Sequence, residues 1–474
     1  MVGICFMLLL VGCKKETGTT EGDTASQGSQ ASQESHSFLD NILSGLQKEE
    51  EREEDNAANH GVLAIMETED GYYYNAGCNT YLFIEEGAIN VAQNSQKHRL
   101  RYYDKASGQA IVLCNKPECE HRGDDTCAAT YKELNVINSV LYEDKIYIYG
   151  LEEDGTMLRL NLYRAALDGS SIDKVGTVLE AENTIGAEYK FKPVTSVDSD
   201  FYFIIHKGSA YIPYYLTIGE TTSGFQGGGL VKMDLQTGET KTLHEMEYKI
   251  NPYPGNLWGC GDYVYINFIQ GTVYLNKGSE RYVISKDIVE GLPSDKDLKY
   301  PMTYDAFAAE RYYTLELSYD PETGEIGEFY GIGVRDAVTG EYLKDETFMT
   351  DITREETKYF KSVTIYEDMM VLGTKERVVF YSLAAEDRGT KLGEIEYVQE
   401  FPELSMYLPF LEYKVANGKL YRITEGERVP AYDIEAQVYR EYEVYEVFYC
   451  PLEDIMNGKG EWTKAFSYEA AEVM

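Results

Sequence analysis

A chain of 474 residues can hold two or three ordinary domains or one large repeat domain. It carries 81 acidic and 43 basic residues, a formal net charge of −38, and a surface of that sign repels nucleic acid and anionic lipid. We therefore expect no nucleic-acid partner and interpret the acidity as a solvated surface, with attraction of cations or basic partners as the alternative. Tyrosine is abundant, at 42 residues against 17 phenylalanines. It suits half-buried strands because its ring packs while its hydroxyl reaches the solvent edge.

The first 13 residues resemble a bacterial lipoprotein signal peptide. An apolar run over residues 4–11 is too short to span a bilayer and fits the apolar region of a signal peptide. The run leads into Leu10-Val11-Gly12-Cys13, which looks like a lipobox, although no Lys or Arg precedes it. The resemblance implies that Cys13 carries the lipid and that the mature protein is extracytoplasmic, held to the cell membrane through this anchor only. The alternative is an apolar N-terminus that arose by chance.

Two segments without strand character follow. Residues 14–37 are rich in Thr, Gly, Ser, Gln and Glu and cannot bury enough apolar surface to fold, so we expect a flexible tether. Residues 38–58 carry apolar side chains at the spacing of one helical face, followed by an acidic block over 48–55. Ser37 with Asp40 three residues later resembles a capping pair. A short amphipathic and acidic helix is therefore predicted over 38–58.

From residue 60 to residue 470 the sequence predicts short strands and no helix, and one sequence pattern recurs. A polar or acidic turn leads into an aromatic or β-branched strand at seven places, residues 69–74, 143–148, 198–203, 260–265, 309–314, 366–371 and 417–422. A second turn, ending in Gly, follows in several units, at residues 103–108, 166–169, 233–238 and 335–340. In such turns Gly supplies a positive φ and Asp bonds its own backbone.

Two β-hairpins per unit, repeated seven times, predict an all-β fold over residues 60–470. We expect a β-propeller of seven four-stranded blades, preceded by the short N-terminal helix, because closing such a repeat leaves no open sheet edge. Unit four, over residues 257–300, lacks a clear copy of the second turn, so the blade count depends most on this unit. Two packed β-sandwiches are the alternative.

Three cysteines and one histidine are concentrated between the first two units. Cys114, Cys119, His121 and Cys127 offer three soft thiolates and an imidazole, a full tetrahedral set for structural zinc, although their spacing is not that of a standard zinc finger. The alternatives are disulfides, with Cys78 as the fourth member, and reduced thiols. In each case we expect a structural role, because a nucleophilic Cys–His pair would not need two further cysteines.

These features together resemble a known family. The lipobox, the Asp-Gly-x-Tyr-Tyr phrase at residues 70–74 and the Cys–His segment are similar to those of the tyrosine-rich β-propeller lipoproteins of anaerobic gut Firmicutes, a family of unknown function. The resemblance covers nearly the whole mature chain. It implies a lipid-anchored propeller at the cell surface and supplies no role for the cysteine segment.

The sequence contains none of the enzyme motifs that we sought, so no catalytic residue is predicted. There is no G-x-S-x-G and no phosphate loop, and Tyr248 stands where a zincin motif beginning at His244 needs its second His. We therefore expect a non-catalytic surface protein whose propeller binds a glycan, a peptide or a partner protein at one face. The alternative is a hydrolase or lyase of extracellular polysaccharide, with carboxylates or Tyr in the central channel.

One aromatic, Gly-rich excursion in the third unit is a candidate for the ligand-binding surface. It contributes Tyr211, Tyr214, Tyr215 and Phe225. Rings next to glycines can line a surface for sugars or peptides. The alternative interpretation is a long hairpin that packs within its own blade.

Overall fold

In the computed structural model the chain falls into two units, Met1–Glu53 and Glu54–Met474, and only residues of the second are described. The structure describes residues 65–76, 80–85, 88–93, 99–119, 127, 129, 134–154, 157–182, 189–190, 203–218, 225–247, 252–260, 263–270, 278–285, 288–291, 305–308, 310–319, 326–356, 362–374, 377–396, 413–425, 429–433 and 438–472. The predicted signal peptide, tether and helix over residues 1–58 lie outside this part.

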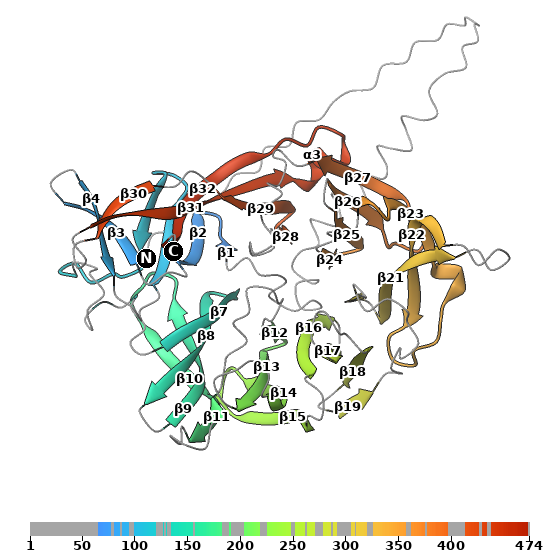
Figure 1. Cartoon of the computed structure of the whole chain (residues 1–474), viewed down its shortest axis with the longest axis horizontal. Coiled ribbons are helices and arrows are strands. Elements are labelled where there is room, and N and C mark those ends of the chain that lie inside the picture. Colours follow the sequence, from blue (N-terminus) through green and yellow to red (C-terminus); the bar gives the residue numbers. More distant parts are fainter. Residues whose placement is uncertain are drawn as a thin grey trace, which may run out of the picture. The chain divides into compact units, whose positions relative to one another are not determined.

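The described part of the second unit forms seven predominantly antiparallel sheets, numbered here in chain order (Figure 1). Sheet 1 contains β1 (Ile65–Glu67), β2 (Gly71–Ala76), β5 (Arg99–Asp104) and β6 (Gln109–Val112). Sheet 2 contains β7 (Leu134–Tyr142), β8 (Lys145–Asp154), β9 (Met157–Ala166) and β10 (Ile172–Glu182). Sheet 3 contains β11 (Tyr189–Lys190), β12 (Ile204–His206), β13 (Ser209–Ile218), β14 (Phe225–Asp234) and β15 (Thr240–Glu247).

The remaining four sheets follow the same plan. Sheet 4 contains β16 (Pro252–Cys260), β17 (Tyr263–Gln270), β18 (Gly278–Ser285) and β19 (Ile288–Gly291). Sheet 5 contains β20 (Asp305–Ala308), β21 (Arg311–Tyr319), β22 (Ile326–Asp336) and β23 (Phe348–Thr353), with η1 (Lys344–Glu346) before β23. Sheet 6 contains β24 (Ser362–Tyr366), β25 (Met369–Gly373), β26 (Arg377–Ser382) and β27 (Lys391–Glu396). Sheet 7 is built on β28 (Tyr413–Ala416), β29 (Lys419–Glu425), β31 (Val438–Pro451) and β32 (Thr463–Glu472), with α3 (Leu452–Met456) between the last two.

Sheet 7 is extended by strands that come from the first unit of the repeat. The hairpin of β3 (Thr80–Glu85) and β4 (Ala88–Gln93) leaves sheet 1 between β2 and β5. β4 then pairs in parallel with β30 (Val429–Asp433), which itself pairs with β31. Sheets 1 and 7 are therefore connected through their backbones. The predicted four-stranded unit is present in every sheet, including the fourth, with added strands in sheets 3 and 7.

The turn between the first and second strands lies where the sequence predicted it in six sheets and not in sheet 3. There the predicted acidic pattern at residues 198–203 leads into β12, the first strand of the sheet. The structure places the turn at Lys207–Gly208, between β12 and β13, with φ angles of 47° and 70°. Two consecutive residues with positive φ are typical of a type I′ hairpin turn. The predicted pattern therefore leads into the first strand in sheet 3 and into the second strand in the other six sheets.

The second turns confirm the predicted turn chemistry. Gly108, Gly169, Gly238 and Gly340 all have φ between 69° and 74°. In the third sheet the Asp234 carboxylate accepts the Thr237 backbone N–H at 2.7 Å, and Asp336 accepts the Thr339 N–H at the same distance in sheet 5. Asp oxygens and left-handed Gly residues thus close these hairpins locally.

The core consists of apolar clusters between consecutive sheets. Side chains alternate between the two faces of a strand, so Tyr73 packs toward sheet 2 while Tyr72 and Tyr74 pack toward sheet 7. Five further clusters join sheets 2 and 3, 3 and 4, 4 and 5, 5 and 6, and 6 and 7. First strands also contact one another in series, with β12 against β7 and β16, and β20 against β16 and β24.

Tyrosine hydroxyls connect neighbouring sheets, which accounts for part of the tyrosine content. Tyr73 of sheet 1 donates to the Leu167 carbonyl of sheet 2 at 3.0 Å. The Gly208 backbone N–H of sheet 3 donates to the Tyr142 hydroxyl of sheet 2 at 3.2 Å. A phenylalanine would pack equally well at these positions but could not make the polar contact.

Candidate functional site

Three of the predicted ligand residues come together on the segment that leaves sheet 1. The Sγ atoms of Cys114, Cys119 and Cys127 all lie within 4.8 Å of one another. Cys127 is buried, and the other two are partly exposed. The predicted fourth members, His121 and Cys78, lie outside the described residues, as does Cys13.

Backbone contacts position this segment between sheets 1 and 2. Leu113 is buried in the cluster between these sheets, and its N–H donates to the Leu100 carbonyl at 3.0 Å. The Cys119 N–H donates to the Lys116 carbonyl at 3.1 Å, a turn that folds the chain back toward Cys114. Gly169 of the sheet 2 turn lies so close that a Cβ there would be 2.8 Å from the Leu113 backbone. The cysteine segment therefore contacts both sheet 1 and sheet 2.

The cluster has the chemistry of a thiolate metal centre. A tetrahedral zinc with Zn–S bonds of about 2.3 Å holds its sulfur ligands about 3.8 Å apart, within the limit seen here. A disulfide, with an S–S bond of about 2.05 Å, can join only two of three sulfurs. Convergence of all three on one point therefore fits a soft divalent ion. Cys450 does not belong to this site, because it is buried between sheets 6 and 7, and burial raises the pKa of its thiol.

Two of the four predicted ligand-binding aromatics of sheet 3 are core residues. Tyr211 and Tyr214 of β13 are only 9% and 6% exposed. Tyr211 packs between sheets 3 and 4, and Tyr214 packs between sheets 2 and 3. Tyr215 and Phe225 lie on β13 and β14, and their side chains are outside the described part. The rings of Tyr211 and Tyr214 therefore pack against neighbouring sheets and are not available at the surface.

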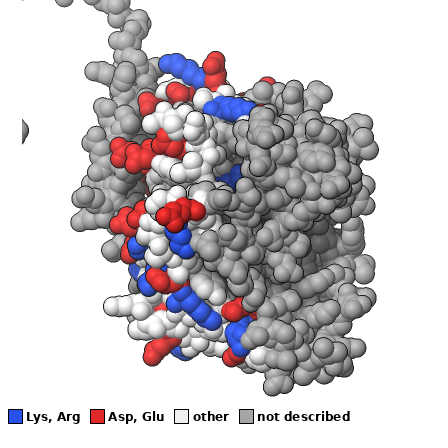
Figure 2. Space-filling view, turned by 90° about the vertical axis from the view of Figure 1, so that its left-hand side faces the viewer, with Lys and Arg blue, Asp and Glu red and all other residues white. Residues whose placement is uncertain are grey.

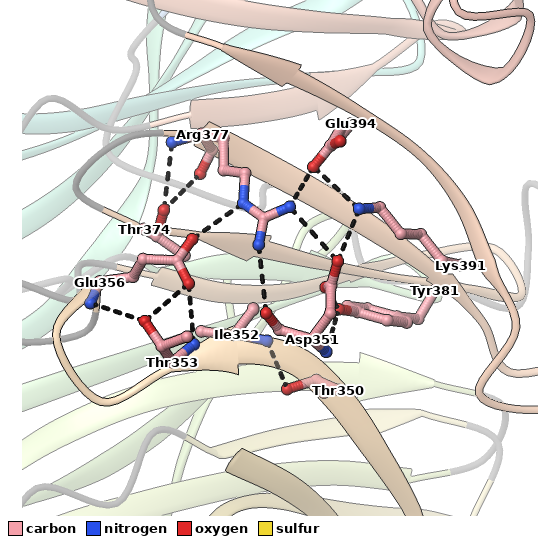
Figure 3. Close-up of polar contacts among 10 residues, drawn as sticks. All are labelled: Thr350, Asp351, Ile352, Thr353, Glu356, Thr374, Arg377, Tyr381, Lys391 and Glu394. Carbon is pink, nitrogen blue, oxygen red and sulfur yellow. Dashed lines mark hydrogen bonds and ion pairs between the residues drawn. The ribbon is translucent and has the colours of Figure 1, made fainter. Parts of the chain in front are cut away.

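A charged network joins sheets 5 and 6 (Figure 3). Arg377 of β26 donates from Nε to Glu356 at 2.9 Å and from Nη2 to the Asp351 carbonyl at 3.2 Å. Lys391 Nζ bonds Asp351 at 2.7 Å and Glu394 at 2.9 Å. Burial opposes ionisation of Asp351, but hydrogen bonds from Lys391 and Tyr381 and the charge of Arg377 outweigh it and lower its pKa to about 2. A carboxylate held ionised by two cations stabilises the sheets and is poorly suited to general acid–base catalysis.

A pocket that sequence analysis did not identify opens between the turns of sheets 5 and 6. Its volume is about 310 Å³, and its lining includes Ala308, Arg311, Tyr313, Asp368, Leu383 and Arg388. Glu346 fixes both guanidinium groups, accepting from Arg311 Nε at 2.9 Å and Nη2 at 3.0 Å and from Arg388 Nη1. The sequence feature that indicates this pocket is Ala308, because the corresponding residues of two other units, Tyr142 and Tyr366, are tyrosines.

Charges of both signs occur on the face of the described residues that Figure 2 draws. Figure 2 shows acidic and basic side chains interspersed on the described face, with no large region of one sign. Among the described helices, none has the length and apolarity needed to cross a bilayer.

Comparison with known proteins gives weak structural similarities only. No protein-family model and no curated protein matches the chain. The computationally designed protein Ika8 is 13% identical over 87% of this chain and 92% of that one, with a TM-score of 0.40. The WD40 domain of SCAP from fission yeast is 9% identical over 88% and 89%, with a TM-score of 0.34. The polysaccharide lyase Uly1 is 8% identical over 72% and 90%, with a TM-score of 0.33. Similarities this weak indicate nothing about activity.

Proposed function

We propose that the chain is a non-catalytic lipoprotein of a bacterial cell surface, anchored through Cys13. In this proposal the seven sheets are the blades of a closed β-propeller, and one face of that propeller binds a glycan, a peptide or a partner protein. The lipobox-like sequence and the resemblance to tyrosine-rich lipoproteins support the anchor. The cluster between sheets 7 and 1, with the pairing of β4 and β30, supports closure.

The observation that carries the binding role is a backbone contact repeated in five sheets. The residue after the third strand donates its N–H to the turn between the first two strands, as in Lys105 to Asp70 at 3.0 Å and Leu235 to Gly208 at 3.1 Å. Sheets 5, 6 and 7 repeat it at 2.9, 2.7 and 2.9 Å. In these five sheets both turns therefore lie side by side at one edge. In a propeller those edges make up one face, and surface turns on a rigid scaffold are where recognition residues concentrate.

The charged groups support a non-catalytic role. Glu67, Glu346 and Asp351 each contact two or more cationic side chains across an interface or a turn. Such pairing lowers the carboxyl pKa and removes the proton that a general acid would need. The described carboxylates with these contacts therefore serve the scaffold.

We also propose that Cys114, Cys119 and Cys127 hold zinc, with His121 as the fourth ligand. The bound ion would cross-link the segment between sheets 1 and 2 and add its binding free energy to folding. Elemental analysis of the purified full chain should find about one zinc per chain. Cys119→Ser should lose it, and Cys450→Ala should keep it. A mass spectrum with bonded cysteine pairs and no metal would overturn the zinc proposal.

The anchor and the binding role can be tested in the full chain. Cys13→Ala should release the protein from membranes, and continued membrane association would contradict lipidation. The full chain should bind discrete members of immobilised polysaccharide and peptide arrays without changing their mass. Cleaved or unsaturated products from a bound polysaccharide would replace the binding role with the hydrolase or lyase alternative.

A further inference from the structure

At two junctions between sheets, the first strand ends in a tyrosine. Tyr142 is the last residue of β7, and its hydroxyl accepts the Gly208 N–H of the next sheet at 3.2 Å. Tyr366 is the last residue of β24, and its hydroxyl accepts the Gly418 N–H of the next sheet at 3.1 Å. Both glycines are the second residue of the turn between first and second strands. At each junction a phenol ring therefore lies against the neighbouring turn.

Sheet 5 has an alanine at this position. Ala308 ends β20 and pairs with Arg311, just as Tyr142 pairs with Lys145 and Tyr366 with Met369. The turn of the next sheet is at residues 367–368, so Asp368 has the sequence position of Gly208 and Gly418, although in this turn only Glu367 has a positive φ. Ala308 and Asp368 both line the pocket of about 310 Å³. The pocket thus lies where a tyrosine ring lies at the other two junctions.

Loss of the ring does not by itself leave a pocket. Sheet 7 also has an alanine at this position, Ala416. At its junction with sheet 1, Lys105 Nζ lies against the turn and donates to the Thr68 carbonyl at 2.7 Å and the Glu69 carbonyl at 3.3 Å. In contrast, Arg311 and Arg388 beside the sheet 5 pocket both bond Glu346, which holds them at the pocket wall.

The pocket wall is largely charged, but part of it can contact an aromatic ring. Tyr313 lines it and is 3% exposed, and within the described residues its hydroxyl has no hydrogen bond. Leu383 and Ala384 supply apolar contact. The planar guanidinium groups of Arg311 and Arg388, already oriented by Glu346, can stack on a ring.

We propose that this pocket binds a phenol ring, the chemistry of a tyrosine side chain, with the Asp368 N–H donating to the phenol oxygen. The inference rests on the proposed binding role and names the chemistry of its ligand. The exposed Glu367 and Glu386 carboxylates at the same pocket disfavour anionic rings such as phosphotyrosine. A neutral phenol is therefore the preferred ligand.

Titration of the full chain with p-cresol, followed by NMR, tests the proposal. Wild type should show saturable binding, and Ala308→Tyr should weaken it at least tenfold because the new ring fills the space. Toluene should bind about fivefold more weakly than p-cresol, since it lacks one hydrogen bond. Acetyl-Gly-Tyr-Gly-amide in a parallel titration should bind at the same residues if peptides supply the ring. Binding of p-cresol alone would assign the pocket to free phenols.

A matched control separates loss of the space from a folding defect. Ala308→Ser changes the same residue without adding a ring and should keep p-cresol binding. Absence of saturable binding to wild type, or undiminished binding to folded Ala308→Tyr, would overturn the pocket proposal. If the protein fails to bind p-cresol but still binds members of the polysaccharide or peptide arrays, the pocket proposal fails while the general binding role stands.

Discussion

Tyr421 of β29 donates its hydroxyl hydrogen to the Glu67 carboxylate of β1, which joins sheet 7 to sheet 1. Lys105 and Lys419 reach the same carboxylate at 2.8 and 2.7 Å. Only 6% of the Glu67 side chain is exposed. Burial opposes ionisation of Glu67, but hydrogen bonds from Lys105, Lys419 and Tyr421 outweigh it and lower its pKa. One carboxylate therefore holds two ammonium groups and a phenol at the contact between the first and last sheets.

Glu67→Gln should lower the free energy of unfolding by about 1–3 kcal/mol, because it removes one partner from two ion pairs whose lysines are partly exposed. Urea unfolding of the full chain measures this change. Glu69→Gln, on the exposed turn nearby, is the control and should change stability by less than about 0.5 kcal/mol. Equal effects of the two substitutions would show that the Glu67 contacts contribute nothing specific.

The Asp351 network predicts an acid-sensitive contribution to stability. The pKa of Asp351 is about 2 in the folded protein, below its ordinary value of 3.8. Its contribution is therefore complete above about pH 4 and is lost as pH falls toward 2. Asp351→Asn should cost roughly 0.5–1 kcal/mol at pH 7, a small value because 44% of the Asp351 side chain is exposed.

Urea titrations of wild type and Asp351→Asn between pH 7 and pH 2 measure this dependence. The difference between the two proteins should stay constant down to about pH 4 and then shrink. A difference that grew on acidification would mean that the carboxylate is not held ionised by Lys391 and Arg377.

The tyrosine contacts between sheets give a third prediction. Tyr142→Phe and Tyr366→Phe each remove one hydrogen bond to a turn N–H while keeping the ring, so each should cost about 1 kcal/mol. The two sites lie at different junctions, and the double variant should therefore lose the sum of the two single losses. Thermal and urea unfolding of the three variants check this. Single variants as stable as wild type would show that the hydroxyls only happen to lie near the turns.

Local turn chemistry was readable from the sequence, whereas contacts between distant units were not. The Asp234 and Asp336 turns follow from side-chain oxygens and left-handed Gly residues within five positions, so their sequence determines them. The Glu67–Tyr421 contact joins residues 354 positions apart, and no local pattern encodes it.

The same distinction separates the two candidate sites. The Cys114, Cys119 and Cys127 cluster could be predicted because its ligands are close in sequence. The pocket at Ala308 could not, because it arises from the absence of a ring at a junction that only the packed sheets define. The pattern in sheet 3 differs for a related reason, since acidic residues before an aromatic run can precede the first strand of a sheet as readily as the second.

The last prediction concerns the contact between the cysteine segment and sheet 2. Gly169 has a φ of 69°, and a Cβ there would lie 2.8 Å from the Leu113 backbone and 3.0 Å from the Cys114 nitrogen. Gly169→Ala should therefore combine backbone strain with a clash that no side chain can relieve, at a cost of about 2–4 kcal/mol. Urea unfolding measures the loss.

Gly458→Ala is the matched control, because Gly458 has a φ of 65° and no atom within 4 Å of its added Cβ. It should cost only about 1 kcal/mol, the strain of a positive φ. Gly169→Ala should also speed hydrogen exchange of the Asn115 N–H, which donates to the Gly169 carbonyl at 3.5 Å, while Gly458→Ala should not. Equal losses in the two variants, with unchanged exchange at Asn115, would mean that the cysteine segment does not rest on the sheet 2 turn.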